Sequence, residues 1–278
     1  MRVLALLVTG VVLMTGCSGD QTPEAGSNPS VAASSSTATP APPPPTASEA
    51  PVPDDGACHR MTFDEALAPT SGLGSVRCAQ AHTAETYAVG RVDGLADGHL
   101  LAVDSDRVQR QVATTCPDAL AEAVGGSLEA VRLSMLRAVW FTPTVEESDA
   151  GSDWYRCDVV ALAGADELTK VRGSLAGVLS TESGRNAYGM CGTAGPDDDA
   201  FERVPCAESH SWRAFSVIDL PSGDYPVRAA VADAGQGPCK DAAGAIADDK
   251  LDYEWGFEGP DPDQWAAGQT FIRCWAPD

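Results

Sequence analysis

The sequence predicts an α+β protein built from two tandem disulfide-bonded repeats, each ordered strand, helix, strand, strand, after a disordered linker. Three observations predict this fold. The motif Val-x-Cys-Ala-x-x-His occurs as VRCAQAH at residues 76–82 and as VPCAESH at residues 204–210. Each copy belongs to a set of four cysteines that recurs in one order. The hydrophobic patterns after each copy also recur, first alternating and then helical.

Eight of the nine cysteines belong to the repeats, and the ninth is Cys17. An even number of recurring cysteines in a secreted chain indicates disulfides. The close Cys-x-x-Cys pairs of zinc sites are absent from the sequence. If both repeats share one pattern, three pairings remain. We choose first with second and third with fourth, which joins Cys58 to Cys78, Cys116 to Cys157, Cys191 to Cys206, and Cys239 to Cys274.

The first residues are typical of a secretory signal, assigned to residues 1–16. Arg2 precedes a twelve-residue apolar run, Val3 to Met14, which is shorter than the ~20 residues of a membrane-spanning helix. The Thr-Gly pair before Cys17 resembles a bacterial lipobox, in which the cysteine is acylated and becomes the mature N-terminus. We therefore expect a lipid anchor on Cys17. The alternative is a plain signal peptide with an incidental cysteine.

Residues 17–55 are predicted to form a linker rich in Pro, Ser and Thr. Between residues 18 and 53 there are nine Pro, eleven Ser or Thr and no aromatic residue, so the segment cannot bury enough apolar surface to fold. The run APPPP at residues 41–45 favours extended polyproline structure. The linker is then a tether that holds a domain away from the membrane, or a spacer without a required length.

The chain after the linker is acidic. Residues 58–278 contain 17 basic and 35 acidic residues, which leaves a net charge of −18. Such a surface repels phosphate backbones, so no nucleic-acid partner is expected. The acidic residues match no calcium-loop motif, and we expect neither a cofactor nor a metal.

The first repeat is assigned to residues 56–183. Its strand is predicted at 84–94, where Tyr87 and Val89 lie on one side and Thr86 and Ala88 on the other. The spacing of apolar residues predicts an amphipathic helix over 104–124 that begins at Asp104 or Ser105, with Pro117 marking a break or a second start. Two strands, at 136–144 and 154–162, flank an acidic loop.

The second repeat is assigned to residues 184–278, and residues 180–189 are predicted to be a loop that leads into it. Its helix is predicted in two pieces, broken between Gly235 and Pro238. The predicted elements are a strand at 213–223, helical pieces at 225–235 and 239–249, and strands at 253–257 and 270–276.

The combined pattern resembles the septum-formation family of actinobacterial envelope proteins. The pattern of that family begins with Gly-x-Cys and continues with Val-Pro-Cys-x-x-Pro-His-x-x-Glu. A cysteine in a helix follows, and a closing Trp-x-x-Gly precedes the last cysteine. The matching residues here are Val204, Pro205, Cys206, His210, Trp265, Gly268 and Cys274 in the second half, and Cys78, His82 and Glu85 in the first.

The chain departs from this pattern at three positions. The proline before the histidine is Ala81 in one copy and Ser209 in the other, and the glutamate after the histidine is Arg213 in the second copy. The resemblance implies an envelope protein associated with septum formation or cell division. It supplies no catalytic residue.

Four residues are weak binding candidates: His82, Glu85, His210 and Trp212. A histidine with a carboxylate can transfer protons or bind metal. However, His82 and Glu85 are three residues apart at the start of a strand, where such positions tend to face opposite sides. We expect each histidine to order the turn after a disulfide instead. Arg156 and Arg273, each before the last cysteine of its repeat, are expected to pair with local acids.

The tryptophans could stack on cell-wall sugars if they are exposed, but we expect them to pack against strands and disulfides. They are Trp140, Trp154, Trp212, Trp255, Trp265 and Trp275.

No catalytic motif stands out, because G-x-S-x-G, S-x-x-K and H-E-x-x-H are all absent from the sequence. The sequence therefore predicts a protein that is not an enzyme, anchored by lipid on the outer face of the cytoplasmic membrane. Its expected partners, besides the membrane, are envelope or division proteins or cell-wall polymer. The predicted function is non-catalytic binding in the envelope, at the division septum. The alternative is a module for cell-wall glycan or peptide unconnected to division.

Overall fold

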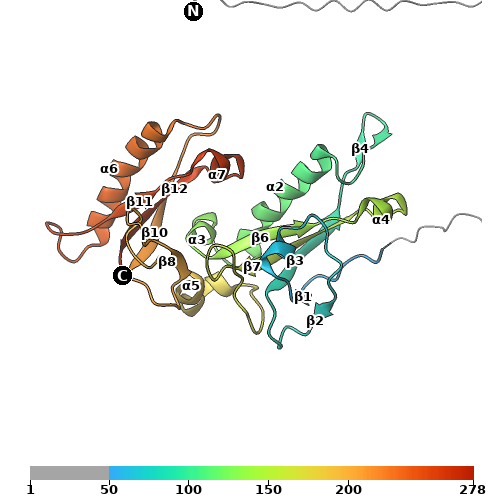
Figure 1. Cartoon of the computed structure of the whole chain (residues 1–278), viewed down its shortest axis with the longest axis horizontal. Coiled ribbons are helices and arrows are strands. Elements are labelled where there is room, and N and C mark those ends of the chain that lie inside the picture. Colours follow the sequence, from blue (N-terminus) through green and yellow to red (C-terminus); the bar gives the residue numbers. More distant parts are fainter. Residues whose placement is uncertain (1–49) are drawn as a thin grey trace, which may run out of the picture. The chain divides into compact units, whose positions relative to one another are not determined.

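The structure, a computed structural model, describes residues 50–278 (Figure 1). The predicted signal peptide, the lipidation residue Cys17 and most of the predicted linker lie outside the described residues. The described part is a mixed α/β fold with antiparallel sheets, in which each half carries a five-stranded sheet and one long helix.

The first half is a sheet with strand order β2-β1-β3-β7-β6. The long helix α2 packs on β6, β3 and β7 (Figure 1). Its buried residues recur at helical spacing, with Val108, Val112 and Leu120 toward the sheet. The bounds are β1 Cys58–His59, β2 Ser75–Val76, β3 Ala84–Arg91, α2 Asp106–Ala123, β6 Leu136–Phe141 and β7 Trp154–Ala161.

The second half carries a sheet with strand order β9-β8-β10-β12-β11. Each strand thus holds the place of its counterpart in the first sheet, and helix α6 packs on β12, β11 and β10 as α2 does on its own sheet. The bounds are β8 Met190–Gly192, β9 Arg203–Pro205, β10 Trp212–Asp219, α6 Arg228–Ile246, β11 Gly256–Glu258 and β12 Phe271–Pro277.

Shorter elements fill the connections. Three of them, α1, α4 and α7, begin with a capping box in which the N-cap side chain and the third helical residue exchange hydrogen bonds. The bounds are α1 Phe63–Ala66, β4 Leu95–Ala96, β5 His99–Leu100, α3 Leu128–Arg132, α4 Val145–Asp149, η1 Val178–Ser180, α5 Glu182–Tyr188 and α7 Pro262–Ala266.

Helix α5 corrects the prediction of a loop at residues 180–189. Its N-cap Thr181 accepts a hydrogen bond from Gly184 N–H, so the polar run begins a helix rather than a loop. The expected boundary between the repeats, at residue 183, therefore falls inside a helix.

All eight described cysteines are paired, in the one of the three shared patterns that was chosen from the sequence. In each half one bridge ties the first short strand to the turn after the second short strand, and the other ties the long helix to the fourth strand in the sheet order, β7 or β12. The bridges are Cys58–Cys78, Cys116–Cys157, Cys191–Cys206 and Cys239–Cys274.

Both long helices run through their prolines, so the predicted breaks at Pro117 and before Pro238 are wrong. A proline inside a helix removes one backbone hydrogen bond and costs about 3 kcal/mol. Both prolines are exposed, and each neighbours a buried cysteine, Cys116 or Cys239, that is bonded to the sheet. The packed face and the disulfide hold each helix together across the missing bond.

The central strand of each sheet contains a bulge that breaks the predicted alternation. The register shifts between Thr86 and Ala88 in β3, and between Ala214 and Ser216 in β10. Tyr87 and Ala88 both pack on the α2 side against Cys116 and Cys157, although alternation predicted opposite sides. A bulge adds one residue to a strand and re-aims the side chains around it.

The halves share one apolar cluster. Met135 at the start of β6 packs with Met190, Ala214 and Trp275 of the second half. Backbone bonds support this contact, since Met135 N–H donates to Tyr188 O at 2.8 Å and Met190 N–H donates to Leu133 O at 2.8 Å. Among the helices of residues 50–278, none has the length and apolar character needed to cross a membrane.

Candidate functional site

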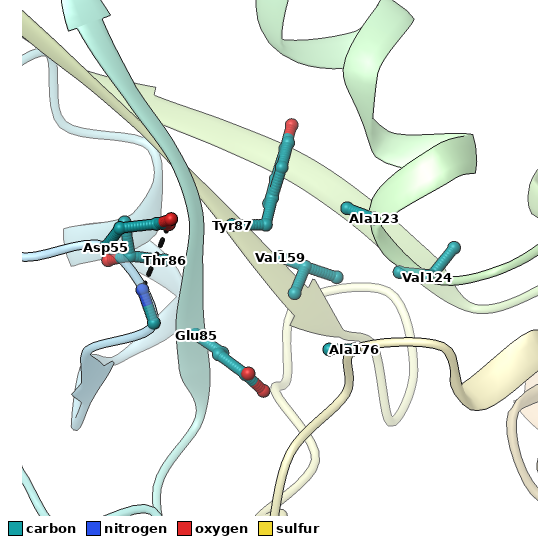
Figure 2. Close-up of a pocket in the computed structure, with 9 residues that line it drawn as sticks. Asp55, Glu85, Thr86, Tyr87, Ala123, Val124, Val159 and Ala176 are labelled. Atoms are coloured by element: carbon teal, nitrogen blue, oxygen red, sulfur yellow. Dashed lines mark hydrogen bonds between the residues drawn. The ribbon is translucent and has the colours of Figure 1, made fainter.

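Glu85 lies beside a small pocket next to α2 (Figure 2). The pocket has a volume of about 260 Å³, and Tyr87 and Val124 also line it. The Glu85 carboxylate accepts hydrogen bonds from the Ser174 hydroxyl and the Leu175 backbone N–H, each at 2.5 Å. Glu85 is therefore engaged in fixing the segment after β7, and the pocket wall beside it is largely apolar.

His82 and Glu85 lie close together, which corrects the expectation that they face opposite sides. Ligand atoms of His82, Glu85 and Cys58 lie within 4.8 Å of one another. Strand β3 begins only at Ala84, so the alternation rule does not extend back to His82. Instead His82 pairs its backbone with Val171 and folds over the disulfide.

This group supplies few free donors. Its sulfur belongs to the Cys58–Cys78 disulfide and is not a thiolate. The His82 ring donates from Nδ1 to Gln80 O at 2.9 Å, and Nε2 is buried without a partner. One imidazole nitrogen and one occupied carboxylate fall short of a four-ligand zinc site. The contact to Gln80 is the turn-ordering contact expected of His82.

The second half forms a similar group from a different carboxylate. His210 Nδ1 donates to Glu208 O at 2.7 Å, which repeats the turn contact of His82. His210 Nε2 lies 3.1 Å from the Asp278 carboxylate, and Arg213 Nε donates to the same oxygen at 2.7 Å. Burial alone would raise the pKa of Asp278, but the bonds from Arg213 and His210 lower it. Arg213 thus occupies the place of Glu85, and Asp278 supplies the acid.

None of the six tryptophans is fully exposed, and Trp154 and Trp275 are buried. Trp212, a binding candidate from the sequence, packs in the cluster shared by the two halves. Its ring lies over Gly195, where an added Cβ would stand 3.1 Å from a ring atom. These contacts agree with the expectation that tryptophans serve packing.

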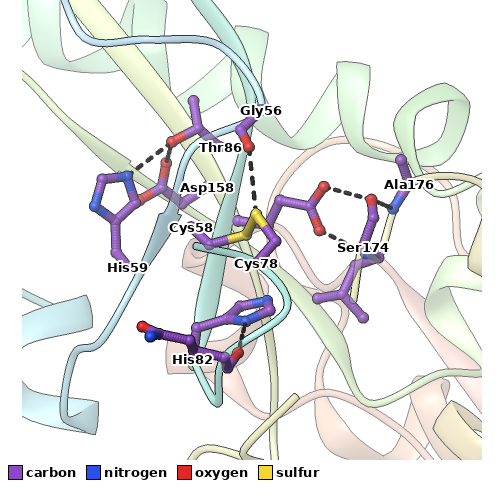
Figure 3. The surroundings of a disulfide bond; sticks show 12 residues. Gly56, Cys58, His59, Cys78, His82, Thr86, Asp158, Ser174 and Ala176 are labelled. Carbon is purple, nitrogen blue, oxygen red and sulfur yellow. Dashed lines mark hydrogen bonds between the residues drawn. A yellow bond between two sulfur atoms is a disulfide. The ribbon is translucent and has the colours of Figure 1, made fainter. Parts of the chain in front are cut away.

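A buried polar group lies beside the first disulfide, on the sheet face opposite α2 (Figure 3). Thr86 donates its hydroxyl proton to Asp158 at 2.7 Å, and the His59 Nε2 lies 3.2 Å from that hydroxyl. Asp158 pairs with Arg156 at 3.0 Å, as expected for Arg156, and the guanidinium lies over the Phe141 ring. In a hydrolase triad the histidine accepts the hydroxyl proton. Here the carboxylate accepts it, so Thr86 is not an activated nucleophile.

Burial dominates the titration of this group. It raises the pKa of Asp158, and the Arg156 cation opposes that shift. Burial, followed by the Arg156 cation, lowers the pKa of His59. The fold therefore favours the neutral form of the His59 ring.

The positions of the second sheet that correspond to His59, Thr86 and Asp158 in the strand pairing carry no such polar group. Gly192 stands in place of His59, Ala214 in place of Thr86 and Trp275 in place of Asp158. The Trp275 ring fills this space and packs edge-to-face on Phe201 at 5.1 Å. The polar group is therefore a feature of the first half alone.

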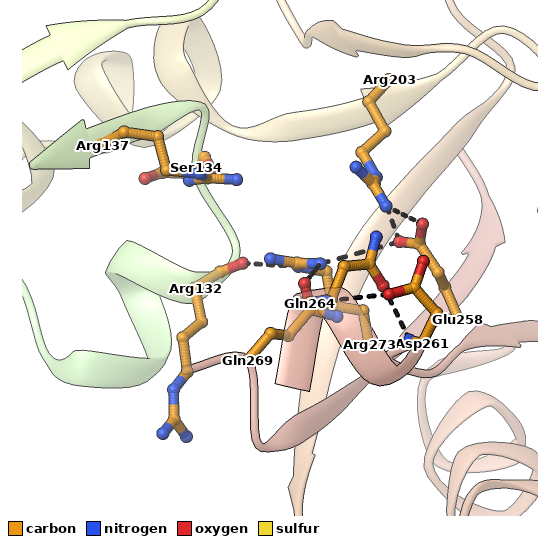
Figure 4. A network of polar contacts seen from close by, with 9 residues as sticks. All are labelled: Arg132, Ser134, Arg137, Arg203, Glu258, Asp261, Gln264, Gln269 and Arg273. Atoms are coloured by element: carbon orange, nitrogen blue, oxygen red, sulfur yellow. Dashed lines mark hydrogen bonds and ion pairs between the residues drawn. The ribbon is translucent and has the colours of Figure 1, made fainter. Parts of the chain in front are cut away.

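A cluster of arginines lies where the second sheet meets the first half (Figure 4). Glu258 pairs with Arg203 through two oxygens and lies 3.7 Å from Arg273. Arg273 also donates from Nε to the Arg132 carbonyl at 2.9 Å and faces the Phe271 ring. Arg273 thus pairs with a local acid, as the sequence predicted.

Arg137 joins this cluster from the first half. Its Nη1 donates to the backbone carbonyls of Ser134 and Leu136, at 2.9 and 2.7 Å. Burial, together with the Arg203 cation, lowers the pKa of Arg137 to about 10. No carboxylate within residues 50–278 forms an ion pair with it.

Arg137 and Arg203 line a cavity of about 610 Å³ between the halves. Met135, Leu162 and Phe201 form its apolar wall, and exposed Glu167 and Glu202 also line it. Sequence reasoning missed this site because its residues come from four separate segments. Nothing in a single segment distinguishes such an arginine from any other surface cation.

The fold and these sites define a disulfide-stabilised mixed α/β protein whose most prominent histidines serve structure. A comparison with family models finds one match, to the family described as Septum formation, over residues 55–274. The chain therefore belongs to the septum-formation family. The match is a single one that spans both halves. No curated protein and no solved structure matches the chain significantly.

Proposed function

We propose that the protein is a non-catalytic binding protein of the cell envelope that acts in septum formation. The family match over residues 55–274 carries this proposal. The site geometry supports the non-catalytic part, because His82, His210 and Glu85 are each engaged in local hydrogen bonds. The halves also differ where shared chemistry would need them alike, at Thr86 and Ala214 for example.

We infer further that the chain holds two copies of one structural unit, in residues 56–183 and 184–278. The shared strand order, the shared positions of the four disulfides and the shared bulge in the central strand support this inference. The two units contact each other through Met135, which packs with Met190, Ala214 and Trp275.

We infer that Cys17 is acylated and anchors the protein outside the cytoplasmic membrane. The lipobox-like sequence before Cys17 and the disulfides, which persist in oxidising compartments, support this inference. Replacing the cysteine, as Cys17→Ala, should release the protein from the membrane fraction and remove the acyl mass. Retention of the variant in that fraction would contradict the anchor.

The test of the septal role is the position of the tagged full chain in dividing cells. Enrichment at septa, with delayed or misplaced septa on deletion, is expected. The anchor variant serves as a control, because release should abolish enrichment without unfolding the domain. Uniform placement together with normal septation in the deletion strain would rule the role out.

A second candidate function is binding of cell-wall peptide without a role in division. The arginine-lined cavity favours it, because Arg137 there is a half-buried arginine that forms no ion pair with a carboxylate of residues 50–278. Purified peptidoglycan separates the two functions. Direct sedimentation of the protein with it supports wall binding, and co-purification with division proteins supports the first proposal.

A further inference from the structure

Arg137 is half-buried and differs from the two buried arginines of residues 50–278. Arg156 has Asp158 at 3.0 Å and Arg273 has Glu258 at 3.7 Å, whereas within the same residues Arg137 donates to backbone carbonyls and forms no ion pair. A partly buried cation without an acid is costly to keep. The backbone bonds engage one nitrogen of its guanidinium, Nη1, and the cation lies beside the cavity without an ion pair.

The cavity wall carries charges of both signs. Glu167 and Glu202, the two exposed glutamates that line it, form no ion pair with any cation of residues 50–278. Glu258 is already shared between Arg203 and Arg273. The wall therefore carries one arginine and two carboxylates that form no ion pair within residues 50–278, together with an apolar surface around Met135 and Phe201.

We propose that this cavity binds a short peptide that carries one carboxylate and one ammonium group. The carboxylate would pair with Arg137, because a guanidinium offers two parallel donors to it. The ammonium would lie toward Glu167 and Glu202, and small apolar side chains would cover Met135, Leu162 and Phe201. A phosphate dianion is a poorer ligand, because three glutamates line the same cavity. The proposal deepens the second candidate function, yet binding in solution is independent of any role at the septum.

The probe is trialanine, titrated into the full chain and followed by changes in backbone amide NMR signals at residues 135–137 and 201–204. Saturable shifts at these positions are expected. Trialanine amide, which lacks the carboxylate, should bind at least about tenfold more weakly, and so should N-acetyl-trialanine, which lacks the ammonium. Inorganic phosphate should not compete.

Variants assign the contacts. Arg137→Gln should weaken trialanine binding at least about tenfold, and Arg137→Lys should bind with intermediate affinity, because the charge remains without the paired donors. Glu202→Gln, at an exposed position that carries little risk to folding, should weaken trialanine but not its N-acetyl form. Arg110→Gln is the control, since Arg110 is 73% exposed on α2 and should bind as the parent does.

Three results would overturn the proposal. They are no saturable shift with trialanine in the parent chain, equal binding of the amide, and parental affinity in a folded Arg137→Gln variant. Competition by phosphate at similar concentration would replace the peptide with a general oxyanion. None of these outcomes depends on where the protein lies in the cell, so they leave the septal proposal to its own test.

Discussion

Arg156 and Arg273 lie at corresponding positions of the two sheets, on β7 and β12. Each arginine has two neighbouring positions on its sheet face, one two residues along the strand and one across the ladder. Around Arg156 the first is Asp158 and the second Phe141. Around Arg273 the first is Trp275 and the second Glu258. Both arginines thus keep one acid and one aromatic neighbour, and the two have changed places.

Removing one partner of the Asp158–Arg156 pair should destabilise the fold strongly. Burial raises the pKa of Asp158, so ionising this carboxyl opposes folding, yet removing it leaves Arg156 buried without an acid. We expect Asp158→Asn to lower the unfolding free energy by about 3 kcal/mol, measured in urea. The control Asp106→Asn removes a pair that is 93% exposed at its acid and should change stability by less than about 1 kcal/mol. Equal losses in both variants would contradict this account of the buried pair.

His59 should make the free energy of unfolding decrease at acidic pH. Burial lowers its pKa, so the folded state favours the neutral ring. The stability that this contributes is present above the ordinary pKa of about 6.5 and is lost as pH falls toward the lower folded value. Between pH 7.5 and 5.5 the parent should lose up to about 1.4 kcal/mol more than His59→Asn, measured by urea unfolding at each pH. The parent and His59→Asn both keep Asp158, whose raised pKa changes stability with pH in the opposite direction. That contribution is therefore common to the two proteins. Identical pH profiles would exclude His59 as the source.

At the scale of elements, helix α6 offers a matched pair of glycines. An added Cβ at Gly237 would meet nothing within 4 Å, whereas one at Gly235 would stand 2.8 Å from the Phe257 ring. Gly237→Ala should therefore raise the unfolding free energy by about 0.5–1 kcal/mol through helix propensity. Gly235→Ala should lower it by about 1–3 kcal/mol through overpacking. Thermal and urea unfolding measure both, and stabilisation by Gly235→Ala would show that the sheet side of α6 is loosely packed.

Elements with strong periodicity could be predicted from the sequence, and those held by other contacts could not. The strand at β3, the helix at α2 with its N-cap at Ser105, and the strands β6 and β7 are where alternation and helical spacing predicted them. The short strands β1 and β2 were missed, because two residues each give no pattern. The prolines in α2 and α6 misled the prediction because packing outweighs propensity.

The site was predictable only where its parts are local. The cysteine order limited the disulfides to three shared patterns, one of which is observed, and the histidines beside them could be placed at turns. The arginine cluster joins β6, β9, β11 and β12, and its meeting point depends on how the halves pack. The sequence contains no signal for that contact. At the scale of the whole molecule, the contact between the halves therefore forms both the apolar cluster around Met135 and the arginine-lined cavity.

Met135 is the residue through which this contact can be tested. Met135 directly precedes strand β6 in the first half and is 1% exposed. It packs on Met190 and Trp275 of the second half. Met135→Ala should cost about 2–5 kcal/mol, because it leaves a cavity in the shared cluster. Since neighbouring units open separately when their interface is weakened, hydrogen exchange should speed up in β8 and β12 while the α2 amides remain protected.

Met61→Ala is the matched control for this experiment. Met61 is 5% exposed and packs with Phe141 and Trp154 within the first half alone. Its loss should speed exchange around β1 and β7 and leave β8 and β12 unchanged, as measured by mass spectrometry on the same peptides. If both variants raised exchange evenly across residues 50–278, the two sheets would form one cooperative unit. The contact at Met135 would then not be a separable interface, and the arginine-lined cavity beside it would be a fixed part of a single core.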